Sequence, residues 1–296
     1  MFYKLPEIEY IRVSELDEAL RLLSRKEDVK VLAGGTDLVV DMKIGRYRPK
    51  TVIDISGIKD LRYIVDEGDK VRIGALTRMQ DIVESPVIRE KLPVLAEAVS
   101  MLGSWQIRNM ATVGGNLCNA SPAADSAPPL LVHEARIKLA SIEGTREIPI
   151  TEFFVGPRKT AMYKTELLQE VIVPYDADFA KSYSYVKLGR RNAFTLSVVA
   201  VATVLKVRDG VFEDVRIALN AVAPTPVRAR SVESFLKGRE VGSEAIEKAS
   251  ELVLNDISPI SDVRASAEYR KHASKILVKD TLLKALEKAG LKEVSD

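Results

Sequence analysis

Two Gly-Gly segments are the parts of this sequence with the clearest potential for ligand chemistry. The first is VLAGGTDL at residues 31–38, between an expected strand and an expected helix, and the second is ATVGGN at residues 111–116. Glycine lets backbone N–H groups approach a ligand closely, and a strand–turn–helix arrangement adds the positive end of a helix dipole. The pair therefore fits a ligand with two phosphates, with two ordinary turns as the simpler alternative. Neither segment is a Walker A or GxGxxG motif, so a P-loop or Rossmann site is not expected.

Three further side chains could take part in such a site. Asp125 lies in the Pro-rich segment 119–129 and could accept hydrogen bonds from ribose or ribityl hydroxyls, or could simply form a turn. Lys187 lies in an expected strand, where it could be a cation near developing negative charge or an ordinary solvated lysine. Trp105 could face a planar ring, although a single tryptophan is more often part of a core.

The cysteine and histidine content restricts the redox chemistry of this chain. The only cysteine, Cys118, forms no internal disulfide and cannot hold an iron–sulfur cluster, and the two histidines, His133 and His272, provide no histidine-rich metal site. We expect Cys118 to be a small buried apolar residue, His133 to be structural and His272 to be solvated. A redox centre would thus be an organic cofactor or lie on a partner. No nucleophile–base pair indicates a hydrolase.

Length and charge set further limits. The 296 residues correspond to about two or three domains. The 44 basic and 42 acidic residues give a net charge of +2, which argues against a nucleic-acid binder. No signal peptide is apparent, and the most apolar stretch, residues 196–207, is too short to span a membrane. We therefore expect a cytoplasmic protein without a membrane span.

Strand and helix patterns divide the chain into three regions, residues 1–57, 58–175 and 176–296. The first region predicts helices from residue 14, capped by Ser14, and over 36–45, capped by Thr36, with strands at 29–33 and 51–55. The second predicts strands at 62–67, 70–75, 135–141 and 166–174, with helices at 77–85 and 92–102. Gly68-Asp69 predicts a type I′ hairpin turn.

Two other parts of the chain complete the predicted secondary structure. Residues 103–129 show little regular pattern, and such a long loop is usually functional. The third region predicts three strands, at 183–189, 197–207 and 214–222, followed by helices at 230–237, 243–255 and 266–288. Strands followed by helices indicate an α+β unit with a three-stranded sheet.

Four motifs carry a resemblance to a known family. VLAGGTDLVVDMK, IGALTRM, QIRNMATVGGN and SPAADSAPPLL occur in this order and closely resemble the FAD-binding medium subunit of the molybdenum hydroxylases. This group includes the xanthine dehydrogenases, carbon monoxide dehydrogenases and aldehyde oxidoreductases. The likeness covers nearly the whole chain. It implies a two-subdomain α/β FAD-binding domain of the vanillyl-alcohol-oxidase (PCMH-like) type, over 1–57 and 58–175, followed by an α+β flavoprotein C-terminal domain.

The resemblance also implies the residues that contact FAD. They are Val31, Leu32, Ala33, Gly34, Gly35, Thr36, Asp37, Leu38, Leu102, Thr112, Val113, Gly114, Gly115, Asn116, Asp125, Leu168 and Lys187. Residues 31–38 would wrap the pyrophosphate, residues 112–116 would form a second phosphate-side loop, and Asp125 would contact a cofactor hydroxyl. Leu102 would lie near the adenine or the ring, and Leu168 on the flavin side.

The implied role of the chain is electron transfer. Lys187 would lie close to the isoalloxazine, where a cation would stabilise the anionic reduced flavin and raise its potential. A large subunit with the molybdenum cofactor would oxidise the substrate, and a small subunit with [2Fe-2S] clusters would pass electrons to FAD. An external acceptor such as a nicotinamide, a quinone or oxygen would receive them. No catalytic residue and no metal ligand is expected on this chain.

Departures from the family's sequence pattern restrict which branch of the family this chain resembles. The single cysteine disfavours the hydroxybenzoyl-CoA reductase branch, which carries an additional cluster insert. The GGT sequence, where the carbon monoxide branch often has GGS or GGH, favours aldehyde or purine-type oxidation. A self-sufficient flavin oxidoreductase of the same fold and a flavin-free scaffold subunit remain the alternatives. The former needs a proton donor at the flavin, for which the sequence offers no strong candidate.

Overall fold

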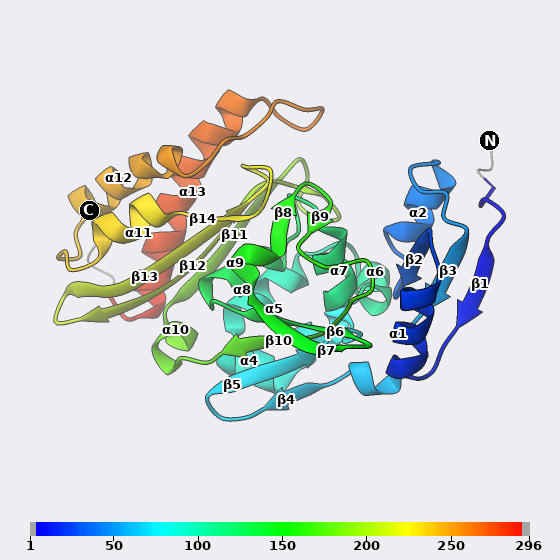
Figure 1. Cartoon of the computed structure of the whole chain (residues 1–296). Coiled ribbons are helices and arrows are strands. Elements are labelled where there is room, and N and C mark those ends of the chain that lie inside the picture. Colours follow the sequence, from blue (N-terminus) through cyan, green and yellow to red (C-terminus); the bar gives the residue numbers. More distant parts are fainter. Residues whose placement is uncertain (1–3, 292–296) are drawn as a thin grey trace.

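Three structural units follow one another along the computed structural model, which describes residues 4–291. Each is built on its own β-sheet. Figure 1 shows the first unit at one end of the molecule, the C-terminal unit at the other and the middle unit between them. The α+β class expected from the sequence is confirmed.

The first unit is a small parallel sheet with two helices. Its elements are β1 (Glu9–Arg12), α1 (Leu16–Arg25), β2 (Val29–Leu32), α2 (Leu38–Lys43) and β3 (Thr51–Asp54), and the strand order is β1-β3-β2. The sequence missed β1 because this edge strand has no buried side chain and hence no apolar alternation. The predicted caps are wrong: Glu15 and Asp37 occupy the N-cap positions, and neither side chain makes a capping hydrogen bond.

The middle unit is built on an antiparallel sheet of order β4-β5-β10-β6-β7. Its strands are β4 (Ile64–Asp66), β5 (Lys70–Gly74), β6 (Arg136–Ser141), β7 (Gly144–Pro149) and β10 (Leu167–Pro174). The predicted hairpin at Gly68-Asp69 is present, but only Gly68 has a positive φ, of 90°. The turn is thus of the II′ kind rather than I′.

Short helices and a small hairpin complete the middle unit. They are α3 (Met79–Glu84), α4 (Pro86–Lys91), α5 (Pro93–Ser100), α6 (Trp105–Met110), α7 (Val113–Asn119), α8 (Ala127–Val132), α9 (Ile150–Phe153), β8 (Phe154–Gly156) and β9 (Lys159–Thr160), with a 3-10 turn at Lys59–Leu61. Much of the expected loop 103–129 is therefore helical. The Ser104 and Thr112 hydroxyls cap α6 and α7 by accepting from the N–H groups of Ile107 and Gly115. Helices this short give no readable period.

The C-terminal unit follows α10 (Ala177–Lys181) and has four antiparallel strands rather than the predicted three. They are β11 (Tyr183–Gly189), β12 (Ser197–Arg208), β13 (Val211–Asn220) and β14 (Val227–Arg228). The two-residue β14 follows Pro226 too closely to be recognised as a strand. Helices α11 (Arg230–Leu236), α12 (Ser243–Leu252) and α13 (Ala267–Lys288), with a 3-10 turn at Val253–Asn255, complete the unit.

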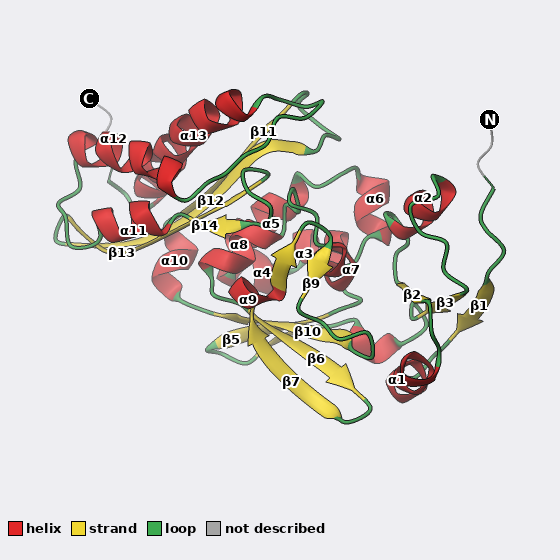
Figure 2. Cartoon of the chain, turned by 45° about the horizontal axis from the view of Figure 1, so that its top comes forward, coloured by secondary structure: helices red, strands yellow, loops and turns green. Residues whose placement is uncertain are grey.

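One hydrophobic cluster is shared by the last two units, and a second lies between the C-terminal sheet and helices α11 to α13. Helix α13 packs on β11 and β12, while α5 and α8 of the middle unit contact the same sheet, as Figure 2 shows. Buried side chains of the sheet, including Tyr185 and Ala202, belong to the same apolar cluster as Val71 and Leu130 of the middle unit. The C-terminal unit is thereby fixed against the helices that follow the second Gly-Gly segment.

Candidate functional site

The two Gly-Gly segments lie against each other. A Cβ atom added to Gly34 would lie 1.8 Å from the Met110 carbonyl oxygen, so only glycine allows this approach between the two backbones. A Cβ atom on Gly115 would lie 4.0 Å from the Ala33 Cβ. We call the two facing segments, residues 33–37 and 111–116, the glycine junction.

One side of the glycine junction carries a run of backbone donors without acceptors. The N–H groups of residues 33–37, which lie between β2 and α2, donate to no group within the described range 4–291. Buried backbone N–H groups in folded proteins nearly always have partners. Because these five residues are only partly covered or exposed, the run is open to a ligand with several acceptor oxygens, such as a diphosphate.

The other side differs from the sequence prediction. Residues 113–116 form the start of α7 and not a loop, and their N–H groups are already used. Gly114 donates to the Ala75 carbonyl at 2.9 Å, Gly115 to the Thr112 Oγ1 at 3.1 Å and Asn116 to the Thr112 carbonyl at 3.0 Å. This segment thus contributes close approach rather than free donors: Gly115 is exposed, and a side chain at Gly114 would collide with Ala75.

Asp125 and Lys187 form a buried ion pair across the boundary between the middle and C-terminal units. Lys187 Nζ lies 2.7 Å from Asp125 Oδ2, with the two side chains 5% and 7% exposed. Asp125 Oδ1 also accepts from Ser197 at 2.6 Å and, at longer range, from Tyr185 and Asn220. Lys187 is therefore not a solvated strand lysine. Burial raises the pKa of the Tyr185 phenol well above its ordinary value, and the negative charge of Asp125 raises it further.

Hydrogen bonds connect this ion pair with other candidate residues. Ser126, next to Asp125, donates to Asn116 Oδ1 of α7 at 2.7 Å, and Lys187 also donates to the Met101 carbonyl at 3.0 Å. Leu102 and Leu168 belong to the shared core and are 8% and 4% exposed, so each offers little surface to a ligand. Their predicted contacts with a cofactor stay predictions.

Three other expectations have different outcomes. The expectation that Trp105 belongs to a core is wrong, because this residue is 59% exposed on α6. The prediction that Cys118 is buried is also wrong. Cys118 is exposed one helical turn beyond Gly115, and its Sγ lies 3.5 Å from Met162 Sδ. His133 is buried and both its ring nitrogens lack partners, whereas His272 is exposed, as expected. Sequence alone could not assign Cys118, because its helix was not recognised.

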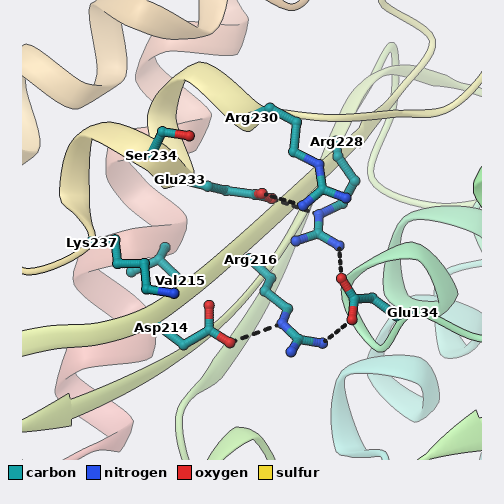
Figure 3. Close-up of a pocket in the computed structure, with 9 residues that line it drawn as sticks. All are labelled: Glu134, Asp214, Val215, Arg216, Arg228, Arg230, Glu233, Ser234 and Lys237. Atoms are coloured by element: carbon teal, nitrogen blue, oxygen red, sulfur yellow. Dashed lines mark hydrogen bonds and ion pairs between the residues drawn. The ribbon is translucent and has the colours of Figure 1, made fainter.

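A charged pocket of about 290 Å³ lies elsewhere, between α8, β13 and α11. In Figure 3 the guanidinium groups of Arg216 and Arg228 point toward Glu134. Arg228 also lies 2.6 Å from the buried Glu233. The carboxylates neutralise these arginines, and the ion pairs between them join the middle and C-terminal units. This pocket is separate from the glycine junction.

Comparison with known proteins identifies the family of this chain. Residues 6–176 match the model of the FAD binding domain in molybdopterin dehydrogenase, and residues 183–285 match the CO dehydrogenase flavoprotein C-terminal domain. The chain belongs to this flavoprotein family. The family resemblance predicted from the four sequence motifs is confirmed.

Individual relatives cover nearly the full length of the chain. A putative xanthine dehydrogenase FAD-binding subunit of Escherichia coli (strain K12) is 33% identical over 95% of this chain and 97% of its own. The glyceraldehyde dehydrogenase medium chain of Sulfolobus acidocaldarius is 33% identical over 92% and 96%. A carbon monoxide dehydrogenase structure from Hydrogenophaga pseudoflava superimposes with a TM-score of 0.93 at 33% identity, covering 96% of this chain and 99% of that one.

Metal-binding groups and membrane-spanning helices are both absent from the described residues. Within residues 4–291, no group of three or more His, Cys, Asp and Glu side chains is arranged to hold a metal ion. No helix in that range has the length and apolar character needed to cross a membrane.

Proposed function

We propose that this chain binds FAD at the glycine junction and serves as the electron-transfer subunit of a heteromeric molybdenum hydroxylase. The unpaired N–H groups of residues 33–37, opposite the close-packed glycines of α7, carry this proposal. They match the acceptor oxygens of a diphosphate, and Gly115 on the opposite side is exposed and carries no side chain. The family match and the relatives named as FAD-binding subunits support the same cofactor.

Each candidate residue then has a physical role. Residues 31–38 bind the diphosphate through their backbone, and residues 112–116 close the opposite side. Asp125 contacts a cofactor hydroxyl through Oδ2, which already accepts from Lys187, since Oδ1 accepts three hydrogen bonds. Lys187 lies near the flavin ring and acts together with its carboxylate partner. FAD, when bound, accepts and releases the electrons.

The remaining components lie on other chains. A large molybdenum-cofactor subunit oxidises an aldehyde or purine-type substrate. A small [2Fe-2S] subunit passes the electrons from that subunit to FAD, and an external acceptor receives them from FAD. The relatives named medium chains support such a division.

The first test is the visible absorption spectrum of the purified full-length chain, with the chromophore released by acid and identified. A flavin spectrum with released FAD, or uptake of added FAD by colourless protein, is the expected result. A colourless protein that fails to take up FAD would favour a flavin-free scaffold subunit.

A further inference from the structure

One carboxylate of the first unit is buried between two arginines that come from different units. Asp41 of α2 is 4% exposed. Its Oδ1 accepts from Arg46, five residues further along the chain, and its Oδ2 accepts from Arg158 at 2.7 Å. Arg46 belongs to the first unit, whereas Arg158 lies 117 residues away in the middle unit.

Arg158 occupies the tip of the β8–β9 hairpin, which lies beside α7 in both Figure 1 and Figure 2. Its backbone N–H donates to the Ala120 carbonyl at 2.9 Å, and its Nη1 donates to Asn119 Oδ1 at 3.0 Å. Its φ of 58° is unusual for a residue with a side chain, so the surrounding contacts must compensate for this strain. The guanidinium is thus fixed to the C-terminal end of α7.

The contact between Arg158 and Asp41 therefore connects the two sides of the glycine junction. Helix α2 begins directly after residues 33–37, and the Asp41 N–H donates to the Asp37 carbonyl at 2.9 Å. Asp41 follows Asp37 by one helical turn, so its ion pair with Arg158 lies next to the run of free donors. Within residues 4–291, which the structure describes, Asp41–Arg158 is the only ion pair that joins residues 4–57 to the rest of the chain.

We propose that Arg158 is a positioning residue for cofactor binding, which holds α2 at a fixed distance from α7 and so preorganises the N–H groups of residues 33–37. This inference rests on the proposed function. A site that is already ordered loses less conformational freedom when its ligand binds, and the saving appears as affinity. Without the Asp41–Arg158 pair, no ion pair within residues 4–291 joins α2 to the middle unit.

The test compares arginines that share one carboxylate. Arg158→Met removes the contact between units, and the matched control Arg46→Met removes only the contact within the first unit. Titration of the full-length apoprotein with FAD, followed by flavin fluorescence, should show a Kd raised about 10-fold or more in Arg158→Met and less than about 2-fold in Arg46→Met. Arg158→Lys, which keeps a cation within reach of Asp41, should recover part of the loss. Equal effects of Arg158→Met and Arg46→Met would overturn the proposal.

A second measurement does not depend on FAD. Hydrogen exchange of the apoprotein should be faster in α2 (residues 38–43) for Arg158→Met and Asp41→Asn, while α13 stays unchanged and Arg46→Met resembles the wild type. Unchanged exchange in α2 would refute the positioning role even if FAD binds normally. Faster exchange in a protein whose wild type binds no FAD would instead refute the proposed function and leave the structural link intact.

Discussion

Lys187 and Asp125 form a 2.7 Å ion pair between β11 and the residue before the N-cap of α8. The pair brings a cation from the C-terminal unit into the middle unit, and both side chains are almost fully covered. Because the carboxylate compensates the lysine charge, the pair stabilises a nearby anion less than a free lysine would. The C-terminal unit thus takes part in the proposed flavin environment rather than only covering it.

Replacement of this lysine should lower the midpoint potential of bound FAD. Lys187→Met leaves the Asp125 charge without its cation, so the anionic reduced flavin becomes less stable. A loss of about 1.4 kcal/mol corresponds to about 30 mV for a two-electron couple, and we expect a decrease of that order. Redox titration monitored by flavin absorbance measures it. Lys284→Met is the control, because Lys284 lines a pocket of about 350 Å³ together with Lys187 but pairs with Asp280 at 2.8 Å. An unchanged potential in Lys187→Met rejects the role of this residue.

A methyl group at the glycine junction should separate its two sides. In Gly34→Ala the added Cβ meets the Met110 carbonyl oxygen and carbon, which are backbone atoms and cannot rotate away. We expect the free energy of unfolding to decrease by about 1–3 kcal/mol and FAD binding to be lost or strongly weakened. Urea denaturation and FAD titration measure the two effects.

The matched control is Gly156→Ala on β8, where an added Cβ finds no atom closer than 3.9 Å. It should keep both stability and FAD affinity close to those of the wild type. If Gly34→Ala behaves like this control, the close approach of the two Gly-Gly segments is not required.

How much of this site follows from the sequence depends on how local its determinants are. The strand before Gly34 and the glycines themselves are local signals, and they predicted a two-sided phosphate site before any contact was known. The helical character of α6 and α7 is also encoded locally, in the caps Ser104 and Thr112, but six or seven residues give too few turns for a periodic pattern.

Pairings between distant side chains were not predictable. The sequence suggested Asp125 and Lys187 separately, yet nothing in it indicates that residues 62 positions apart neutralise each other. Asp41 lies in the motif VLAGGTDLVVDMK and Arg158 lies outside the four motifs, and only the tertiary structure brings the two together. Exposure of Trp105 likewise depends on which face of α6 meets its neighbours.

Acid should destabilise the protein through its buried histidine. Burial lowers the pKa of His133 to about 4, with the nearby Arg216 acting in the same direction and Asp176 against it. The unfolded chain takes up a proton near pH 6.5, whereas the folded chain does so only near pH 4. The free energy of unfolding should therefore decrease by up to about 3 kcal/mol as pH falls through this window, and should change no further through this group below it.

The two histidines of the chain provide a direct comparison. His133→Phe removes the titrating group beside Phe179 and should flatten this part of the pH profile in urea denaturation. His272→Gln, on the exposed face of α13, should leave the profile unchanged. A His133→Phe profile parallel to that of the wild type contradicts the assignment.

Cys118 offers a chemical probe of the proposed FAD position. It is the only cysteine in the chain and is exposed on α7, on the same helical face as Gly115. A maleimide should therefore label Cys118 of the apoprotein at pH 8. Saturating FAD should slow labelling of the apoprotein by at least about 5-fold if the cofactor covers α7. Mass spectrometry follows the modification, and Asp41→Asn, with weakened FAD binding, should need more FAD for the same protection. Labelling at equal rates with and without bound FAD would place the cofactor away from this face of α7.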